Sequence, residues 1–410
     1  MRDWPTMPLG EVADVRMGRQ RSPKNAAGDN VVPYLRAANV KDGALDLSDV
    51  KAMNFDLREQ DIFALKPGDV LVTEGCGSLE QLGASARWDG DLSGVVCFQN
   101  TLLRLRAREG VTLPGYVYTL ARWLFWTGQW AEVSSGTNIF HIGSRRAATL
   151  MVPVPPIDVQ HRVADLAHHA DRYIRATEKV HASLARARSA VFEDELAKLD
   201  VDTAQLGDLA EIKRGGSPRP IDDYFTDDED GLNWIKIGDV APGGKYITST
   251  AQRIRREGLP KTRHVESGTF LLSNSMSFGR PYITQIDGCI HDGWLALSDY
   301  EANLDAEFLY YLLRSEAVQS QFNALAAGSG VRNLNIKVVS TVEIPLPSLA
   351  EQKRIAGLAN IIEERQTAGE RTLEVATRFR RTVLSELFAG QRRVPDAYDR
   401  FLLTADGEVA

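Results

Sequence analysis

The chain has 410 residues, of which 43% are hydrophobic and 25% are charged, and its formal net charge at neutral pH is −7. A chain of this length usually forms two or more domains, because single cores rarely grow beyond about 250–300 residues. No apolar run approaches the ~18–20 residues of a membrane-spanning helix, and the N-terminus lacks the basic segment followed by an apolar segment of a signal peptide. We therefore expect a cytoplasmic protein without membrane contact.

Short β-rich runs separated by Gly, Asp-Gly and Pro breaks fill the first part of the chain. Examples are GDVLVTEG at 68–75 and GVVCFQNTLLRLRA at 94–107, and a helical signal follows at 114–130. This mixture predicts a strand-rich globular domain over residues 1–152.

The next segment is purely helical. After Pro156, apolar and small residues alternate by three and four positions, as in the a/d seam of a coiled coil. These are Val163, Leu166, Ala170, Tyr173, Thr177, Val180, Leu184, Ala187 and Val191. We expect a helix within residues 153–200, and the prolines before it predict a stiff, extended exit from the domain.

The chain then repeats itself. LGEVADVRMGRQRSP (9–23) matches LGDLAEIKRGGSPRP (206–220), VPYLRAANVKDG (32–43) matches LNWIKIGDVAPG (232–243), SGTNIFHI (135–142) matches SGVRNLNI (329–336), and VPVPPIDVQHRVADL (152–166) matches IPLPSLAEQKRIAGL (344–358). Because the matches keep their order, the chain is a duplication of one unit that is too long for a solenoid repeat. The second copy predicts a domain over 201–344 and a helix over 345–393, and the tail 394–410 has no counterpart.

A single amphipathic helix would most simply lie on its own domain. Two long helices with matched apolar phases each need an apolar partner along their length, so we expect them to pair with each other. Arg365 and Gly369 weaken the phase of the second helix. Its predicted apolar positions are Ile355, Leu358, Ile362, Ala376, Phe379 and Val383. The predicted fold class is α+β, with two similar strand-rich domains separated by two long helices that pair as an antiparallel coiled coil.

Catalytic signatures are missing. The sequence has no amino-methyltransferase motif, no phosphate loop, no HExxH and no GxSxG. Cys76, Cys97 and Cys289 lack CxxC spacing, which favours reduced, buried thiols, and Cys289 with His291 lacks further metal ligands. We expect no catalytic residue and no metal site in this chain.

Basic loops are the candidate nucleic-acid contacts. RMGRQRSPK carries Arg16, Arg19, Arg21 and Lys24 around a glycine that would let the backbone approach a ligand. Its counterpart carries Lys213, Arg214, Ser217 and Arg219, and further candidates are Arg36, Lys236, Arg145, Arg146, Arg280, Arg332, Asn333 and Asn335. Such side chains on loops suit phosphate positioning and base-edge contacts. A basic surface loop is more often simply solvated, so charge alone makes each contact a hypothesis.

Geometry strengthens this hypothesis. A helix from about residue 159 to 196 would be on the order of 55 Å long, which corresponds to roughly 15 base pairs of B-DNA. Two similar domains on such a spacer would recognise a split sequence with an unread gap, as paired half-site readers do. Because the loops of the two copies differ, the half-sites should differ too.

These features resemble the specificity subunit of type I restriction-modification enzymes. The resemblance rests on the duplicated LG(E/D) openings, on VPVPPIDVQHRVA and IPLPSLAEQKRIA before the long helices, and on LKPGDVLVTEGCG at 65–77. It implies that each domain is a target recognition domain for one half of a double-stranded DNA site.

The resemblance also implies a division of labour among subunits. The helices would act as a spacer and as the docking surface for two methyltransferase (modification) subunits, and motor-nuclease restriction subunits would join them. S-adenosylmethionine, ATP and magnesium would bind to those partners, and this chain would be a non-catalytic subunit without a cofactor.

Two other classes of protein stay open at this point. The duplicated domains could bind protein, with the helices as the spine of a scaffold. The chain could also be an enzyme with dispersed catalytic residues, or the specificity module of another methyltransferase or phage-defence system. Salt-sensitive DNA binding would favour the specificity subunit over the scaffold.

Overall fold

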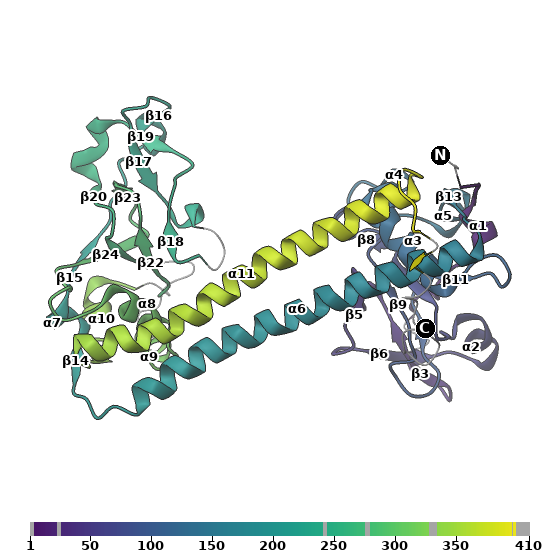
Figure 1. Ribbon diagram of the computed structural model, residues 1–410, viewed down its shortest axis with the longest axis horizontal. Helices are drawn as coiled ribbons and strands as arrows, with labels where there is room; N and C mark the ends of the chain where they lie inside the picture. The colour runs from purple at the N-terminus through teal and green to yellow at the C-terminus, as the bar shows by residue number, and fades with distance from the viewer. Residues whose placement is uncertain are drawn as a thin grey trace. The chain divides into compact units, whose positions relative to one another are not determined.

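The computed structural model confirms the α+β class and shows two long helices, α6 (Ile157–Ala197) and α11 (Leu349–Phe388), packed antiparallel (Figure 1). It describes residues 4–22, 26–240, 244–274, 279–327, 334–395 and 397–398. The chain forms two compact units. Unit 1 contains residues 1–179 and 371–410, and unit 2 contains residues 180–370, so each unit includes one part of each long helix.

Unit 1 is built on two small sheets. Its elements are β1 (Thr6–Pro8), α1 (Leu9–Val12), β2 (Ala13–Met17), β3 (Val31–Leu35), β4 (Val40–Lys41), β5 (Ala44–Leu45), β6 (Lys51–Asn54), α2 (Leu57–Phe63), β7 (Val70–Thr73), β8 (Gly75–Cys76), β9 (Ser85–Arg87), β10 (Cys97–Phe98), β11 (Leu102–Ala107), α3 (Pro114–Trp126), α4 (Gln129–Glu132), β12 (Phe140–His141), α5 (Ser144–Thr149) and β13 (Met151–Pro153). The strand orders are β2-β11-β7-β9 and β10-β3-β6.

Strand β7 shows why this part of the chain folds as a sheet. Successive side chains of a strand point to opposite faces. Val70 and Val72 therefore join the core under α3, while Leu71 joins a second core with Leu35 and Phe98 of the smaller sheet. Because both faces of the strand are covered, all four residues of β7 are buried, and three of them are aliphatic.

Unit 2 repeats this plan. Its elements are β14 (Thr203–Gln205), α7 (Leu206–Leu209), β15 (Glu211–Arg214), β16 (Phe225–Thr226), β17 (Leu232–Ile235), β18 (Tyr246–Ile247), β19 (Arg253–Ile254), β20 (Arg263–Val265), β21 (Phe270–Ser273), β22 (Pro281–Thr284), β23 (Gly288–Ile290), β24 (Trp294–Ser298), α8 (Ala306–Arg314), α9 (Glu316–Ala327), α10 (Ile336–Ser340) and β25 (Glu343–Pro345). Strands β15-β24-β21-β22 follow the order of β2-β11-β7-β9, and β17 pairs with β23 in parallel as β3 pairs with β10. The duplication in the sequence is thus a duplication of topology.

The boundary motif before each long helix has the same structural role twice. The strand that carries it, β13 or β25, pairs antiparallel with β1 or β14 at the start of its unit. In the first turn of each helix a glutamine, Gln160 or Gln352, is buried. Each accepts a hydrogen bond from one backbone N–H of the globular part and donates to two backbone carbonyls. This contact fixes the direction in which the helix leaves the sheet.

Ion pairs link the two long helices at several levels. In unit 1, Asp171 pairs with Arg380. In unit 2, the pairs are His181 with Glu370 at 2.8 Å, Arg188 with Glu363 at 2.9 Å, and Glu195 with Arg354 at 2.6 Å. From one pair to the next the residues advance along α6 by ten, seven and seven positions and go back along α11 by ten, seven and nine positions, as antiparallel packing requires.

The predicted seam is wrong at particular positions. Tyr173 and Val180 are 55% and 58% exposed, and Phe379 on α11 is 64% exposed. Apolar contact between the helices is found at their ends, where Val163 shares the core of unit 1 with Leu384 of α11, and Ile355 shares the core of unit 2 with Phe192 of α6. Between those ends, polar and charged side chains form contacts between the two helices, such as His181 with Glu370.

Only the start of the tail, residues 394–395 and 397–398, lies within the described residues. The Tyr398 hydroxyl donates a hydrogen bond to Asp165 of α6 at 3.0 Å. Burial and the neighbouring Asp165 carboxylate raise the pKa of this phenol above its ordinary value. The beginning of the tail is therefore anchored to α6 in unit 1.

Candidate nucleic-acid interface

The glycine of each basic loop has a structural role that differs from the predicted one. A Cβ atom on Gly18 would lie 2.3 Å from the Gln99 carbonyl oxygen, and a Cβ on Gly215 would lie 2.1 Å from the His291 carbonyl oxygen. The missing side chain therefore lets the loop pass close to a neighbouring part of its own unit. The expectation that this glycine admits a ligand is wrong, because the space is filled by the chain's own backbone.

Beyond each glycine, the basic loop borders a cavity at the same place in the fold. The cavity in unit 1 has a volume of about 870 Å³, and its lining includes Arg21, Ser22, Tyr34, Arg36, Lys51 and Gln99. The cavity in unit 2 has a volume of about 860 Å³, and its lining includes Ser217, Arg219, Trp234, Lys236, His291 and Asp292. We refer to them as the loop cavities. Their walls combine an aromatic residue with cationic and hydrogen-bonding groups.

Strand register makes the two loop cavities equivalent. Tyr34 of β3 is opposite Cys97 of β10, and Trp234 of β17 is opposite Cys289 of β23. Burial raises the pKa of the Cys97 thiol to about 12 and that of the Cys289 thiol to about 11. Both thiols stay protonated and unreactive, as expected for core cysteines. Cys76, in contrast, is only half-buried, and its thiol donates to the Ser78 carbonyl at 2.8 Å.

In unit 1 the cations of the loop differ in availability. Arg19 points inward, where its Nε lies 2.6 Å from Glu59 and its guanidinium lies 5.0 Å from the ring centre of Phe55. Arg21 is exposed at the rim of the cavity, and the described residues offer it no hydrogen-bond or ion-pair partner. Arg36 is bound to Asp49 at 2.7 Å, but its buried Nε has no partner in the described part of the chain. Arg21 is therefore the cation best placed to meet an anionic ligand.

In unit 2 the loop is organised around Asp292. Ser217 donates to this carboxylate at 2.8 Å, and that hydrogen bond lowers the pKa of Asp292. Arg219, whose side chain is 80% exposed, lies 3.5 Å from the same carboxylate. Lys236 donates to Gln252 at 2.5 Å on the far side of the cavity. Burial lowers the pKa of His291, which keeps the ring neutral at pH 7.

The other predicted residues lie outside the loop cavities. Arg16 and Lys213 occupy matched strand positions and pair with Asp14 and Glu211, two residues earlier. Arg146 donates to the carbonyls of Ile142 and His141, Asn335 caps α10 by accepting from the Val338 amide, and the Arg214 Nε donates to the Asp292 carbonyl. Arg145 and Arg280 are exposed. Lys24, Arg332 and Asn333 lie outside the described residues.

The structure thus brings Arg21 and Arg36 together around one loop cavity, and Ser217, Arg219 and Lys236 around the other. Sequence reasoning missed the remaining walls, which include Tyr34, Gln99, Trp234, His291 and Asp292. The matched motifs VPYLR and LNWIK already aligned Tyr34 with Trp234, so that duplication was the signal for these residues.

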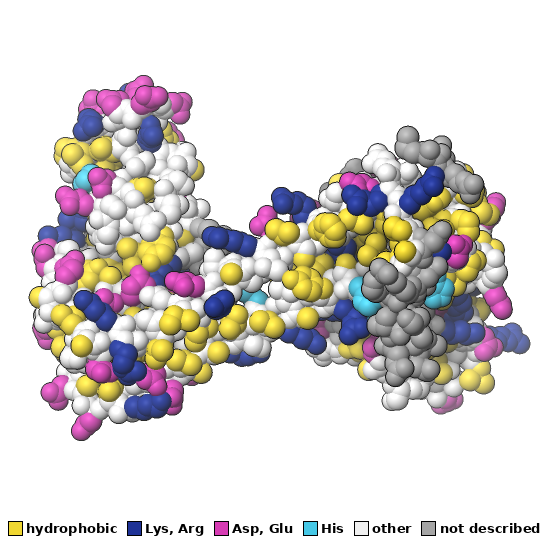
Figure 2. Space-filling view, viewed as in Figure 1, with side chains coloured by type: hydrophobic (Ala, Val, Ile, Leu, Met, Phe, Trp, Pro, Cys, Tyr) yellow, Lys and Arg dark blue, Asp and Glu magenta, His cyan; other side chains and the backbone are white. Residues whose placement is uncertain are grey.

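The basic side chains form no continuous positive patch on the face drawn in Figure 2, where Lys and Arg alternate with Asp and Glu. Acidic side chains gather at the end of unit 2 that carries β16 and β19. An interface with an anionic polymer would therefore depend on individual loops. The described residues contain no group of three or more His, Cys, Asp or Glu that could hold a metal, and no helix among them is long and apolar enough to cross a membrane.

The family model and the relatives that this chain resembles all carry descriptions of type I restriction specificity proteins. Residues 198–371 match the model of the type I restriction modification DNA specificity domain. A putative type I restriction enzyme MjaX specificity subunit of Methanocaldococcus jannaschii is 21% identical and aligns over 96% of this chain and 94% of its own length. The type I restriction enzyme MjaVIII specificity subunit of the same organism is 24% identical over 75% of this chain and 78% of its own length.

Two solved structures share the fold over nearly the whole chain. One, from a study of complex assembly and conformational transition of the type I R-M system, has a TM-score of 0.60 at 19% identity and covers 96% of this chain and 99% of its own. The other, the crystal structure of a type I restriction-modification S subunit from M. genitalium, has a TM-score of 0.56 at 13% identity, with coverage of 94% and 96%.

Proposed function

We propose that this chain, which belongs to the DNA specificity subunits of type I restriction-modification systems, recognises a bipartite site by placing the loop cavity of each unit against one half-site. The observation that carries the proposal is the duplication of the cavity with different walls. Tyr34, Arg36 and Gln99 in unit 1 correspond to Trp234, Lys236 and His291 in unit 2. Two cavities at equivalent positions of the fold but with different side chains suit the recognition of two different half-sites.

The chemistry of the cavity rims fits DNA. Exposed Arg21 and Arg219 can contact phosphates, which fixes the position of a unit on the duplex without selecting a sequence. Side chains such as Gln99, Gln252 and Asp292 can form hydrogen bonds with base edges, which does select a sequence. The net charge of −7 is compatible with this role because phosphates respond to charges within a Debye length of about 8–10 Å.

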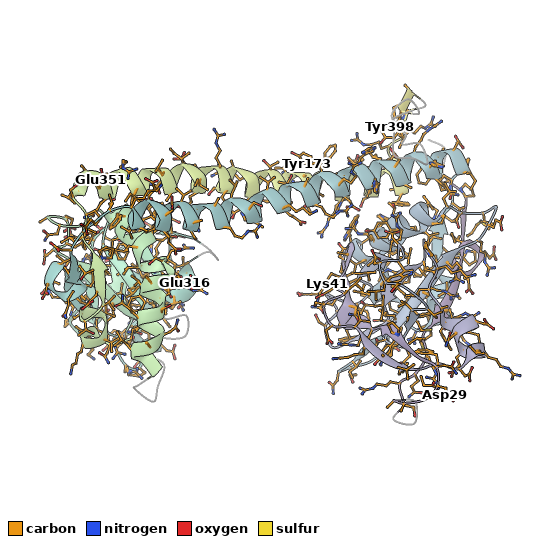
Figure 3. The ribbon with its side chains drawn as sticks, turned by 90° about the horizontal axis from the view of Figure 1, so that it is seen from below. Asp29, Lys41, Tyr173, Glu316, Glu351 and Tyr398 are labelled. Atoms are coloured by element: carbon orange, nitrogen blue, oxygen red, sulfur yellow. The ribbon has the colours of Figure 1, made fainter. Side chains whose placement is uncertain are left out.

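The long helices are proposed to set the gap between half-sites and to dock two methyltransferase subunits. A helix of 41 residues such as α6 is about 60 Å long at 1.5 Å per residue. Tyr173 of α6, which is labelled in Figure 3, exposes more than half of its surface. Val375 and Phe379 of α11 do so as well, and all three residues belong to unit 1. Exposed apolar groups of this kind favour a protein partner.

The chemistry of the complex would belong to those partners. As a specificity subunit this chain is non-catalytic. We infer that S-adenosylmethionine, ATP and magnesium bind to the methyltransferase and restriction subunits, in the cytoplasm where such complexes meet foreign DNA.

A direct test measures binding of the full chain to a pool of random DNA duplexes at several salt concentrations. Arg21→Ala and Arg219→Ala are each expected to weaken binding and to reduce the slope of log K against log salt by about 1. Arg58→Ala is the matched control, because this exposed arginine of α2 lies outside the loop cavity. A DNA affinity that changes neither with the salt concentration nor with either substitution would favour the protein-binding scaffold instead.

Partner docking has its own test. Co-expression with a methyltransferase subunit, followed by sequencing of methylated sites, is expected to give a split motif with a fixed gap. Tyr173→Glu and Phe379→Glu are expected to abolish co-purification without unfolding the chain, since both side chains are exposed.

A further inference from the structure

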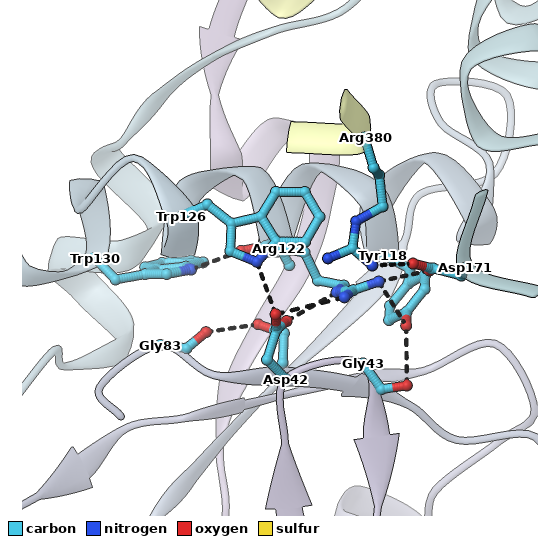
Figure 4. Close-up of polar contacts among 11 residues, drawn as sticks. Asp42, Gly43, Gly83, Tyr118, Arg122, Trp126, Trp130, Asp171 and Arg380 are labelled. Carbon is cyan, nitrogen blue, oxygen red and sulfur yellow. Dashed lines mark hydrogen bonds and ion pairs between the residues drawn. The ribbon is translucent and has the colours of Figure 1, made fainter. Parts of the chain in front are cut away.

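Each unit contains an ionic cluster that joins its globular part to both long helices, and the cluster is buried in unit 1 and partly exposed in unit 2. In unit 1 the centre is Asp171 of α6, which is 3% exposed. Its carboxylate accepts a hydrogen bond from Arg122 of α3 at 2.5 Å and another from Arg380 of α11 (Figure 4). Arg122 continues to Asp42, in the turn between β4 and β5, at 2.8 Å, and Trp126 donates to the same Asp42 at 2.7 Å.

The cluster in unit 2 has the same architecture with different side chains. Its centre is Glu363 of α11, which accepts from Arg188 of α6 at 2.9 Å and from the Tyr311 hydroxyl of α8 at 2.6 Å. Lys245, which is 7% exposed and precedes β18, lies 3.6 Å from Glu363 and pairs with Glu307 of α8. In both units one helix of the globular part, α3 or α8, contacts the helix pair, and one loop residue, Asp42 or Lys245, completes the cluster.

The two clusters occupy equivalent positions of the duplication. Asp171 follows Gln160 by eleven residues, as Glu363 follows Gln352. The same offset that relates the glutamines also relates Arg188 to Arg380. Each copy thus supplies the acid to its own cluster and the arginine to the other one.

The central carboxylate of unit 1 interacts with two buried arginines. Burial alone would lower the pKa of Arg122, but Tyr118, Asp42 and Asp171 outweigh it and raise that pKa. Burial and the positive charge of Arg122 lower the pKa of Arg380, against the attraction of Asp171. Asp171 therefore stands between two buried cations that repel each other, and a neutral side chain there would remove the carboxylate that both guanidinium groups share.

We propose that Asp171 and Glu363 are positioning residues that fix the orientation of each globular part on the helix pair, and that this orientation determines which gap between half-sites is accepted. Apolar burial is non-directional, whereas charge-assisted hydrogen bonds hold defined angles. One base-pair step is only about 3.4 Å, so a modest rotation of a globular part changes the gap that it can reach. This inference rests on the proposed function.

The test uses the full chain and DNA duplexes in which the half-sites, identified by selection from random duplexes, are separated by gaps around the preferred length. Asp171→Asn and Glu363→Gln are expected to keep both half-sites but to reduce the preference for the correct gap over its neighbours at least about fivefold. Asp171→Glu, which keeps the charge, is expected to restore much of the preference. Glu178→Gln, at an exposed position of α6, is the matched control and should leave it unchanged.

A merely structural role would give a different result. Folded variants with a lower melting temperature but an unchanged gap preference would overturn the inference. Should Asp171→Asn fail to fold, Glu363→Gln and Arg380→Lys decide the question, because the Glu363 side chain is 21% exposed and Lys retains the charge of Arg380. If the wild-type chain selects no split sequence at all, the proposed function itself is wrong, and this inference falls with it.

Discussion

Gln160 and Gln352 make the same three hydrogen bonds at the start of the two long helices. Each accepts from the backbone amide of the residue before a helix of the globular part, Leu113 before α3 or Asp305 before α8, and donates to two carbonyls. One donated bond reaches a proline before the long helix, Pro155 or Pro347, and the other reaches the loop before α3 or α8. The recurring boundary motif is therefore a buried polar joint between helix and sheet.

This joint predicts a large loss of stability for Gln160→Leu. The substitution leaves one buried amide and two carbonyls without partners, at a cost of about 2–4 kcal/mol in the free energy of unfolding. Gln352→Leu should behave alike. Denaturant titration of both variants measures the effect, with Gln20→Leu at an exposed position as the control. Variants as stable as the wild type would show that water satisfies these groups.

The glycines of the basic loops give a second prediction. Gly18→Ala and Gly215→Ala place a Cβ within 2.3 Å of a carbonyl oxygen and should cost about 2–4 kcal/mol of unfolding free energy. Gly357→Ala in α11 meets no atom within 4 Å and should be neutral or stabilise the chain by up to about 1 kcal/mol. Thermal unfolding of the three variants distinguishes steric crowding from helix propensity.

His291 predicts a pH dependence. Burial lowers its pKa below the ordinary value of 6.5, so the unfolded chain binds this proton more readily than the folded chain. The contribution to stability is complete above pH 6.5 and decreases as the pH falls through the window below it. His291→Gln, which introduces the residue found at the matched position of unit 1, should reduce the loss of melting temperature between about pH 7.5 and about pH 5.5.

The control for that measurement is His161→Gln on the exposed surface of α6. An equal change in both variants would mean that the environment of His291 is not responsible.

Exchange of one unit tests the modular reading of DNA. Replacement of residues 3–150 by the corresponding part of another specificity subunit is expected to change one half-site and to leave the other half-site and the gap unaltered. Sequencing of methylated DNA from cells that also contain the methyltransferase subunit gives the answer. A change in both halves, or in neither, contradicts the assignment of one half-site to each unit.

Insertion of one helical turn tests the spacer. Four residues added to α6 after Thr177, with four added at the matching level of α11, lengthen the helix pair by about 6 Å. The gap between half-sites should then increase by about two base pairs. An unchanged gap would show that the helices do not set the spacing.

Local sequence patterns predicted the duplication, the strand-rich domains and the two paired helices, because strand and helix periodicities are written in neighbouring residues. They did not predict what covers each helix face. A heptad pattern marked Val180 as a contact, yet its neighbour His181 makes the contact with Glu370 and Val180 is exposed.

The sequence by itself determined the kinds of element, their order and the twofold repetition of the whole plan. Only the tertiary structure decided which charges meet. Arg122 and Asp171 are 49 residues apart, and Arg380 and Asp171 are 209 residues apart, yet all three share one buried cluster. The reason is that hydrogen bonds between distant residues form only after packing has brought their elements together, and packing depends on the summed burial of whole faces rather than on any local pattern.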